Sequence, residues 1–475
     1  MKQQKILGFL SLLAAVLLGL AFYPKNQASP KTAVATKPNI IIIMADDLDS
    51  RQLSCYGGQN IVTKNIDALA KEGLKFNQIY ASEAMCIPTR ASLFTGLYPV
   101  RHGAYQNHKP VNGNLKSVVH YLGDLGYRVG LTGKDHVTKP KSVFPFEIVK
   151  GFEPNCVATT DEYTLDGVKQ FISQPDKPYC LFIMSINPHA PWTVGNPGEF
   201  DAAKLKLPAN WVDTKETRTE FCKYLAEVRR LDNQVGDIMQ LLKETGQDKN
   251  TVVMFLGEQG PQFAGGKWTL WDYGAKSSML VKWPGKVKPN TQTEALVQYE
   301  DITPTLVNLA GGKPINNLDG KSFLPVLTGQ NKELRDYAYG IHNNIPEGPA
   351  YPMRSIRDKK YKLILNLMPD QEYRIKYLMD APSEKLNLWA SMTIWSSWMQ
   401  AAKTSDKAKF LTERVMHKPA VEFYNIQKDP YELTNLAKDP EYKALIAQYT
   451  AKLEAWMQQQ GDAGAALDKQ YTDNN

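Results

Sequence analysis

The stretch that decides the fold is NIIIIMADDL, residues 39–48. From Ile40 to Ala45 it is continuously apolar and rich in β-branched isoleucine, which predicts a strand that is buried on both faces. The run stops at two carboxylates, Asp46 and Asp47. Ligands of open α/β sheets bind beyond the carboxyl ends of the strands. This strand end is therefore the first candidate for a functional site.

Apolar runs alternate with amphipathic stretches on the C-terminal side of this strand. Helical spacing of apolar residues predicts helices within 63–76, 114–127 and 219–246. Further buried strands are predicted in YRVGLTG (127–133), YCLFIMSI (179–186), TVVMFLG (251–257) and SSMLVKWPG (277–285). Strands that alternate with helices predict an α/β fold: a large mixed, mostly parallel sheet sandwiched by helices.

The pattern changes after about Tyr337. Residues 353–367 indicate a hairpin and residues 440–460 a terminal helix. We expect a large domain at 37–335 and a smaller C-terminal α+β domain, with a short antiparallel sheet, at 336–465. The small domain contains Trp395, Trp398 and Trp456, which we interpret as packing residues; an aromatic platform for sugar rings is the alternative.

The N-terminus predicts export. Lys2 and Lys5 precede an apolar run from Ile6 to Tyr23, which is typical of a secretory signal and is also long enough for an uncleaved anchor. We expect residues 1–30 to be either a signal peptide or a membrane anchor. The protein is expected to be exported, either to the periplasm or out of the cell.

The overall composition excludes some classes of protein. With 43% hydrophobic and 22% charged residues, the chain is neither disordered nor a membrane bundle. The net charge of +7 suits an ordinary basic enzyme or one with a polyanionic substrate. Because no Lys/Arg cluster is interleaved with aromatic residues, we expect no nucleic-acid partner.

Polar residues follow four of the predicted strands. Each pair alone has an ordinary explanation as a helix cap, a turn or a structural histidine, but parallel strands bring their carboxyl ends to one edge of a sheet. The residues are Asp46 and Asp47, Lys134 and His136, Asn187 and His189, and Glu258 and Gln259, with Lys267 soon after. Carboxylate and amide oxygens suit Ca²⁺ or Mg²⁺ rather than zinc. A hard cation beside fixed lysines and proton-carrying histidines suits a sulfate or phosphate group.

A cysteine lies at the start of another predicted helix, MCIPTRASLFTG (85–96). Pro88 suits a first helical turn, so Cys86 would lie at the helix N-terminus, where the macrodipole lowers the pKa of a thiol. A thiolate is nevertheless a poor partner for a hard cation. The other cysteines are Cys55, Cys156, Cys180 and Cys222. Five is an odd number, so at least one is unpaired; whether the other four pair is open.

CIPTR (86–90) resembles the Cys-x-Pro-x-Arg signature of the type I sulfatases, which belong to the alkaline-phosphatase-like superfamily, and ASLFTGLYP resembles its continuation. PNIIIIMADDL, GKDH, NPHAPW and GGKWTLWDYGAKSSMLVKWPG are similar to further segments of that family, so the resemblance covers nearly the whole mature chain. Within the family, GKDHV…FPFE and YPMRSIRDKKYKLILNL look most like the heparan N-sulfatase (sulfamidase) branch. One departure is Glu258-Gln259, where the family usually has Asp followed by Asn or His.

The resemblance implies a mechanism. A formylglycine-generating enzyme would convert Cys86 to Cα-formylglycine, whose hydrate attacks sulfur. Residue 86 and Asp46, Asp47, Glu258 and Gln259 would hold one divalent cation, with Ca²⁺ fitting better than Mg²⁺ because its coordination is flexible. The implied roles of the remaining residues are orientation of formylglycine by Arg90, charge compensation by Lys134 and Lys267, general acid catalysis by His189, and removal of a formylglycine hydroxyl proton by His136.

The resemblance and the positive charge together predict a sulfated glycan as substrate. Sulfamidase activity, a phosphate or phosphonate monoester hydrolase, and a non-catalytic glycan-binding protein are the alternatives. The loop 342–354 is predicted to face the substrate, with His342 and Arg354 as candidate contacts. The sugar, the position of its sulfate and the oligomeric state cannot be read from the sequence.

Overall fold

The computed structural model describes residues 37–472 except 138, 156, 158–159, 161, 175 and 381–389. The predicted signal or anchor at residues 1–30 lies outside the described residues. Within the described part of the chain, no helix has both the length and the hydrophobicity needed to cross a membrane.

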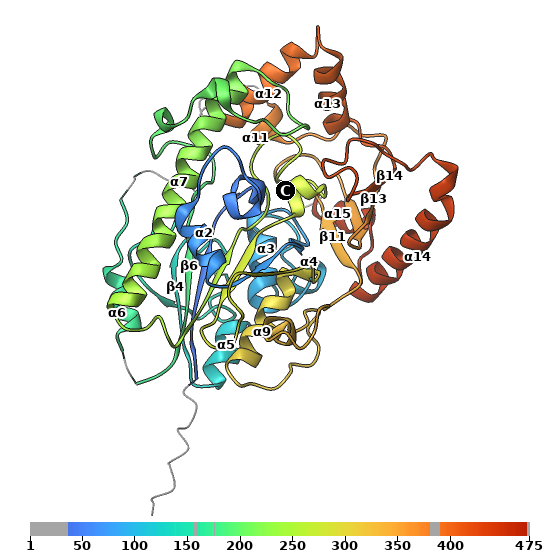
Figure 1. Cartoon of the computed structure of the whole chain (residues 1–475). Coiled ribbons are helices and arrows are strands. Elements are labelled where there is room, and N and C mark those ends of the chain that lie inside the picture. Colours follow the sequence, from blue (N-terminus) through green and yellow to red (C-terminus); the bar gives the residue numbers. More distant parts are fainter. Residues whose placement is uncertain are drawn as a thin grey trace, which may run out of the picture. The chain divides into compact units, whose positions relative to one another are not determined.

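An eight-stranded sheet forms the centre of the fold, in the order β5-β4-β6-β1-β7-β8-β2-β9 (Figure 1). The central strand β1 pairs in parallel with β6 and β7, whereas β8 runs antiparallel to β7 and β2. The predicted mixed, mostly parallel sheet is thus confirmed. The strands are β1 (Asn39–Met44), β2 (Leu74–Phe76), β4 (Arg128–Gly133), β5 (Glu147–Ile148), β6 (Tyr179–Met184), β7 (Thr251–Leu256), β8 (Met279–Lys282) and β9 (Thr291–Thr293).

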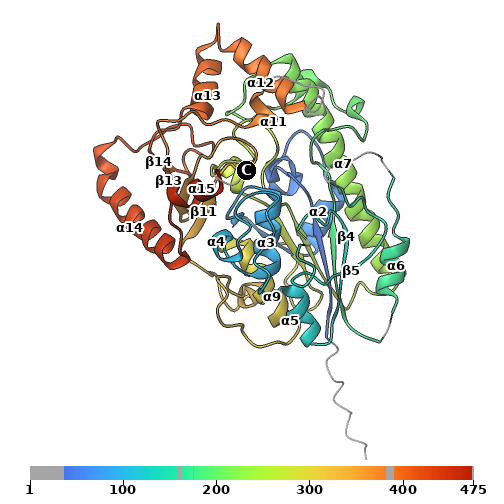
Figure 2. The same cartoon turned by 180° about the vertical axis from the view of Figure 1, so that it is seen from behind.

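Helices cover both faces of this sheet (Figures 1 and 2). Alternate residues of β1 point into different cores: Ile41 and Ile43 pack toward α2 and α7, and Ile40 and Ile42 toward α3, α5 and α9. Such two-sided burial explains why the strand contains no polar residue after Asn39. The helices are α2 (Lys64–Lys71), α3 (Cys86–Thr95), α5 (Val118–Asp124), α7 (Lys215–Glu244) and α9 (Ile302–Leu309).

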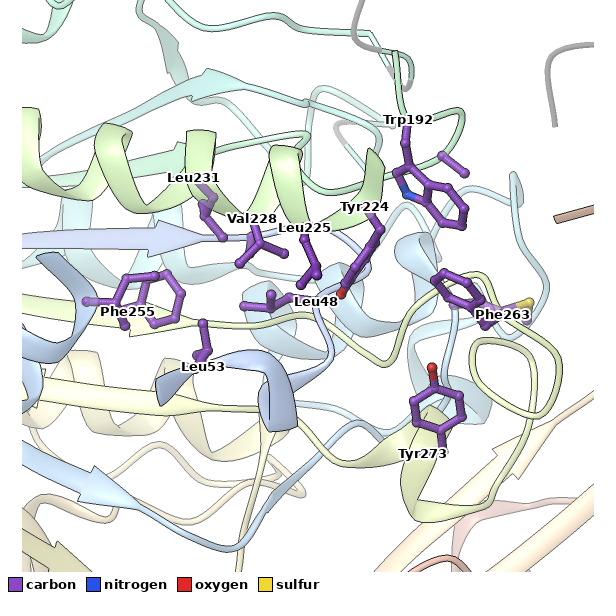
Figure 3. Close-up of a cluster of buried hydrophobic side chains, with 14 of the residues drawn as sticks. Leu48, Leu53, Trp192, Tyr224, Leu225, Val228, Leu231, Phe255, Phe263 and Tyr273 are labelled. Carbon is purple, nitrogen blue, oxygen red and sulfur yellow. The ribbon is translucent and has the colours of Figure 1, made fainter. Parts of the chain in front are cut away.

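The long helix α7 supplies much of the first core. Figure 3 shows Leu225, Val228 and Leu231 of α7 pointing toward Leu48 and Phe255. Leu225, Val228 and Leu231 are all fully buried, and burying one such side chain contributes roughly 1.5–3 kcal/mol. The middle of this helix is therefore fixed against the face of the sheet that carries Ile41 and Ile43.

A second, four-stranded sheet follows in the order β11-β12-β13-β14 and is antiparallel throughout, which confirms the predicted short sheet and its hairpin. The helix α14 packs on it through Tyr449, Leu453 and Trp456. Trp395 and Trp398 are also buried, in agreement with a packing role. The elements are β11 (Ala338–His342), β12 (Met353–Arg357), β13 (Tyr361–Asn366), β14 (Val421–Asn425), α12 (Ala390–Ala401), α13 (Asp406–Met416) and α14 (Lys443–Gln460).

Contacts join both sheets into one compact unit that begins at Pro38. The domain boundary between residues 335 and 336 stays a prediction.

Candidate active site

The polar residues predicted at the strand ends lie together at one edge of the large sheet. The backbone joins these ends directly, because Ala45 N–H donates to the Leu256 carbonyl (2.9 Å) and Asp46 N–H to the Asn187 carbonyl (3.2 Å). Asp47 adopts a left-handed conformation (φ 55°), which turns the chain sharply after β1. The two aspartates can thereby face the same space.

Asp46 and Asp47 each hold a lysine. Lys134, from the end of β4, donates to Asp46, and Lys267 Nζ donates to Asp47 Oδ2 at 2.8 Å. All four side chains are buried. Burial acts to raise the pKa of the Asp46 carboxyl, but the charges of Lys134, His189 and Arg90 and a hydrogen bond with Glu258 together outweigh it, and the pKa lies well below its usual range. Asp46 therefore carries a full negative charge at neutral pH.

Cys86 begins α3, as predicted, and is 1% exposed. Its Sγ lies 3.7 Å from Asp46 Oδ1 and 3.8 Å from Gln259 Nε2. Asp46, Asp47, Cys86 and His189 each offer one ligand atom, and these atoms lie within 4.8 Å of one another.

The prediction of a lowered thiol pKa is wrong. Burial raises the pKa of Cys86 well above its usual range, and the charge of Glu258 adds to this, outweighing Lys134 and Lys267. The unmodified side chain is therefore a neutral thiol. The other described cysteines, Cys55, Cys180 and Cys222, form no disulfide, and Cys156 lies outside the described residues.

Arg90 lies one helical turn after Cys86 and is fully buried. Its Nε donates to Glu258 Oε1 at 2.5 Å and its Nη1 to the Lys134 carbonyl at 3.2 Å, and its Nη2 lies 3.8 Å from Asp46 Oδ2. Each of the three carboxyl groups thus lies within ion-pair distance of Arg90 or one of the two lysines. Burial and the charge of Asp46 raise the pKa of Glu258 to about 8, against the effect of Arg90.

The two predicted histidines differ in position. His189 Nε2 lies 3.3 Å from Lys267 Nζ and 3.6 Å from Asp47 Oδ2; burial and Lys267 hold its pKa well below the usual range. His136 lies further out, with its ring centroid 5.2 Å from that of His108, and burial and Lys134 lower its pKa to about 2. Both rings are neutral at pH 7 in this state, so an acid role for His189 requires bound negative charge to raise its pKa.

The donors fit a hard divalent cation. Asp46 and Asp47 supply buried carboxylate oxygens near Cys86 and His189, and Glu258 is a further buried carboxyl group, paired with Arg90. Carboxylate oxygens are preferred by Ca²⁺. Gln259 directs Nε2 to Asp47 Oδ1 (2.6 Å) and Oε1 to Thr89 Oγ1 (3.3 Å), so its amide would have to turn over to offer the oxygen.

His342 and Arg354 lie elsewhere. Both are fully buried; Arg354 Nη2 donates to Asp462 Oδ1 at 2.9 Å and Nη1 to Asn343 Oδ1 at 3.2 Å. Arg354 is therefore already paired with Asn343 and Asp462. Their predicted contact with substrate stays a prediction, and this placement does not favour it.

Sequence reasoning missed Glu227 of α7. This fully buried carboxylate accepts hydrogen bonds from Asn187 Nδ2 (3.0 Å), Thr193 N (2.9 Å) and Val194 N (3.3 Å), and so fixes the loop that carries His189. A signal was present, because Glu227 lies in an apolar stripe of the helix, three residues after Tyr224 and four before Leu231.

Buried carboxyl groups and fixed cations thus meet at the carboxyl ends of a mostly parallel sheet, an arrangement that suits an anionic substrate. Residues 38–312 match the Sulfatase family model, and residues 265–404 match N-sulphoglucosamine sulphohydrolase, C-terminal. The chain belongs to the sulfatase family and is a sulfuric ester hydrolase, as predicted.

Relatives support this assignment. An ulvan-active sulfatase of Formosa agariphila is 33% identical, over 92% of this chain and 83% of its own. The human N-sulphoglucosamine sulphohydrolase is 26% identical, over 88% and 89%. A structure solved in complex with its substrate D-glucosamine-2-N,6-O-disulfate has a TM-score of 0.71 at 20% identity, covering 90% of this chain and 99% of that one. The phosphonate monoester hydrolase of Agrobacterium radiobacter has a TM-score of 0.67 at 20% identity, covering 89% and 96%.

Proposed function

We propose that this enzyme removes sulfate from a sulfated saccharide, using a Cα-formylglycine formed from Cys86 and one divalent cation. The observation that carries the proposal is the setting of Cys86. It lies buried at a helix N-terminus among three carboxylates and three fixed cations, yet as a thiol it is neutral. A hydrated aldehyde in its place would supply the oxygen nucleophile that a neutral thiol does not.

Asp46, Asp47, Glu258 and Gln259, with residue 86, would hold the cation. We propose Ca²⁺ because its flexible coordination accepts side chains one methylene longer than the usual Asp-Asn pair. When bound, the cation supplies Lewis acidity toward the sulfate oxygens and the nucleophile.

The chain's own residues would then act on the sulfate group. Lys134 and Lys267 offset negative charge on its oxygens, an effect that is strong in a water-excluded site. Arg90 is held by Glu258 and the Lys134 backbone and orients residue 86. His189, next to Lys267, donates a proton to the leaving group once the bound sulfate group has raised the pKa of this histidine. His136 accepts the proton of a formylglycine hydroxyl.

The relatives indicate the class of substrate. One is an ulvan-active sulfatase and another an N-sulphoglucosamine sulphohydrolase, so we propose a sulfated glycan or an oligosaccharide derived from it. An N-sulfoglucosamine sulfohydrolase is the second candidate, favoured by the C-terminal family match at residues 265–404.

Export and maturation belong to the same proposal. The N-terminal sequence directs the chain out of the cytoplasm. Because Cys86 is 1% exposed, a formylglycine-generating enzyme must act before this part of the chain has folded.

The test combines mass spectrometry with a substrate panel. Protein made with and without a co-expressed maturation enzyme is digested with trypsin, and the mass of the peptide of residues 76–90 is measured by mass spectrometry. We expect conversion of Cys86 to an aldehyde, and turnover of 4-nitrophenyl sulfate in proportion to that conversion. Ulvan oligosaccharides and N-sulfoglucosamine then decide between O- and N-sulfate. Full activity with an intact thiol, or preference for 4-nitrophenyl phosphate, would contradict the proposal.

A further inference from the structure

A pocket of about 280 Å³ opens beside the proposed catalytic centre. Ile87, the residue after Cys86, lines it together with two lysines, two histidines and one aspartate. The other lining residues include His108, Lys109, Asp135, His136, Val137 and Lys139. Ligand pockets start at about this size, which suits one sugar ring rather than a polymer.

His108 forms one wall of this pocket together with His136. The two rings meet edge to face with centroids 5.2 Å apart, and the side chain of His108 is 54% exposed. Its backbone is left-handed, with φ 66°. A residue other than glycine adopts this conformation at a cost, and such residues persist where the surroundings hold them.

Those surroundings are built by Asn107 and by Glu347, which comes from the loop after β11. Asn107 Nδ2 donates to Glu347 Oε1 at 2.6 Å, and His108 Nε2 lies 4.0 Å from the same oxygen. Asn107 Oδ1 in turn accepts from Ile87 N–H at 3.4 Å. Glu347, Asn107 and Ile87 thus connect the loop after β11 to the start of α3, which carries Cys86.

Glu347 is only 2% exposed, and no described residue donates a hydrogen bond to its Oε2. A buried carboxylate oxygen that lacks a donor is costly. The imidazole of His108 needs only a small movement to donate to this carboxylate, and hydrogen bonds of this kind are often long before substrate is bound.

We propose that this pocket is the subsite for the sugar ring that carries the sulfate, and that His108 recognises this ring while Asn107 and Glu347 position the imidazole. The inference rests on the proposed saccharide substrate. An imidazole fixed on one side by a carboxylate presents its other nitrogen to the pocket, where it can bond a ring hydroxyl. The loop after β11 thereby contributes to selection of the saccharide through Glu347.

The experiment compares two substrates of the matured, cation-loaded enzyme. 4-Nitrophenyl sulfate has no sugar ring, and the second substrate is a sulfated saccharide that the wild type hydrolyses. The readout is the ratio of kcat/KM for the saccharide to kcat/KM for the aryl sulfate. We expect His108→Ala to lower this ratio roughly 2- to 10-fold, mainly through KM, as the loss of one hydrogen bond between neutral groups predicts.

Glu347→Gln preserves size and tests the positioning role. We expect it to lower the same ratio less than His108→Ala does, and the double variant to be no worse than His108→Ala alone, because Glu347 acts through His108. His108→Asn should restore part of the ratio, because the amide offers a donor for Glu347 and an acceptor for the ring hydroxyl. Glu372→Ala, an exposed glutamate of the same domain, is the matched control.

Two failures can be told apart. If the wild type hydrolyses 4-nitrophenyl sulfate but no saccharide in the panel, the proposed substrate class is wrong. If it hydrolyses saccharides but His108→Ala leaves the ratio unchanged, whether or not both rates fall, the assignment of the subsite is overturned. Additive effects of His108→Ala and Glu347→Gln would overturn the positioning role alone.

Discussion

The loop that carries His189 depends on one buried carboxylate, and Glu227→Ala removes it. The oxygens of Glu227 accept hydrogen bonds from Asn187, Thr193 and Val194. Alanine would leave these donors without that acceptor, in a place that is largely closed to water. We expect a less stable protein whose His189 is no longer held against Lys267.

The magnitude follows from the three lost bonds. A buried donor without a partner costs about 1–3 kcal/mol, and Thr193 is only partly buried, so we expect a total of about 3–6 kcal/mol. Taken over the unit from Pro38 to Asn475, an unfolding entropy of about 2.1 cal/mol/K per residue gives about 0.9 kcal/mol/K. The melting temperature should therefore fall by about 3–7 °C. A displacement of His189 by about 1 Å should lower kcat on the order of 100-fold.

Thermal unfolding and steady-state kinetics measure the two effects. Glu227→Gln keeps the volume and one acceptor oxygen, so it should lose less stability than Glu227→Ala. Glu244→Ala, at an exposed position near the end of the same helix, is the control. The reasoning is refuted if Glu227→Ala matches this control in both melting temperature and kcat.

Three further predictions concern the nucleophile, the cation and a buried carboxyl. Cys86→Ser should abolish sulfatase turnover, because serine cannot provide the hydrated aldehyde; turnover at the wild-type rate would exclude formylglycine. Removing divalent cations with a chelator should lower both activity and melting temperature, since a ligand bound only by the folded state stabilises it; Ca²⁺ should restore both better than Mg²⁺. Burial raises the pKa of Glu300 to about 7, so the folded state holds a proton between pH 4.5 and 7 that the unfolded state releases, and stability is lost as the pH rises through this window. Glu300→Gln should therefore stabilise the protein above pH 7, by at most about 3 kcal/mol, with no gain below pH 4.5; a difference in unfolding free energy that does not change with pH would contradict this.

Much of the site could be predicted because its residues follow local patterns. An apolar run that ends in Asp46-Asp47 identifies both a buried strand and its carboxyl end, and parallel neighbours bring Lys134, His189 and Glu258 to the same edge. No distance in space has to be known for that step. The helix from Cys86 to Gly96 could likewise be predicted from Pro88 and the terminal glycine.

The rest could not be predicted, because it depends on contacts between distant parts of the chain. Asn107 and Glu347 meet across 240 residues of sequence, and nothing local marks either as a partner. The prediction of a lowered pKa for Cys86 was wrong for a related reason. The helix N-terminus can be predicted from the sequence, whereas complete burial and the nearby charge of Glu258 cannot. The antiparallel direction of β8 within a mostly parallel sheet also depends on the connection that precedes it.

The departure at Glu258-Gln259 can be explained by the way the longer side chains are held. Glu258 reaches Arg90 through Oε1, and Gln259 donates to Glu258 Oε2 at 3.0 Å while also reaching Asp47. Each added methylene brings rotational freedom, and these bonds remove it. Arg90, Lys134 and Lys267 lie within ion-pair distance of the three carboxyl groups, so the negative charge that Glu258 gains above its pKa of about 8 would be offset within the site. In the proposed function, the longer pair therefore changes how far the side chains would reach toward the cation, while Glu258 keeps its contact with Arg90.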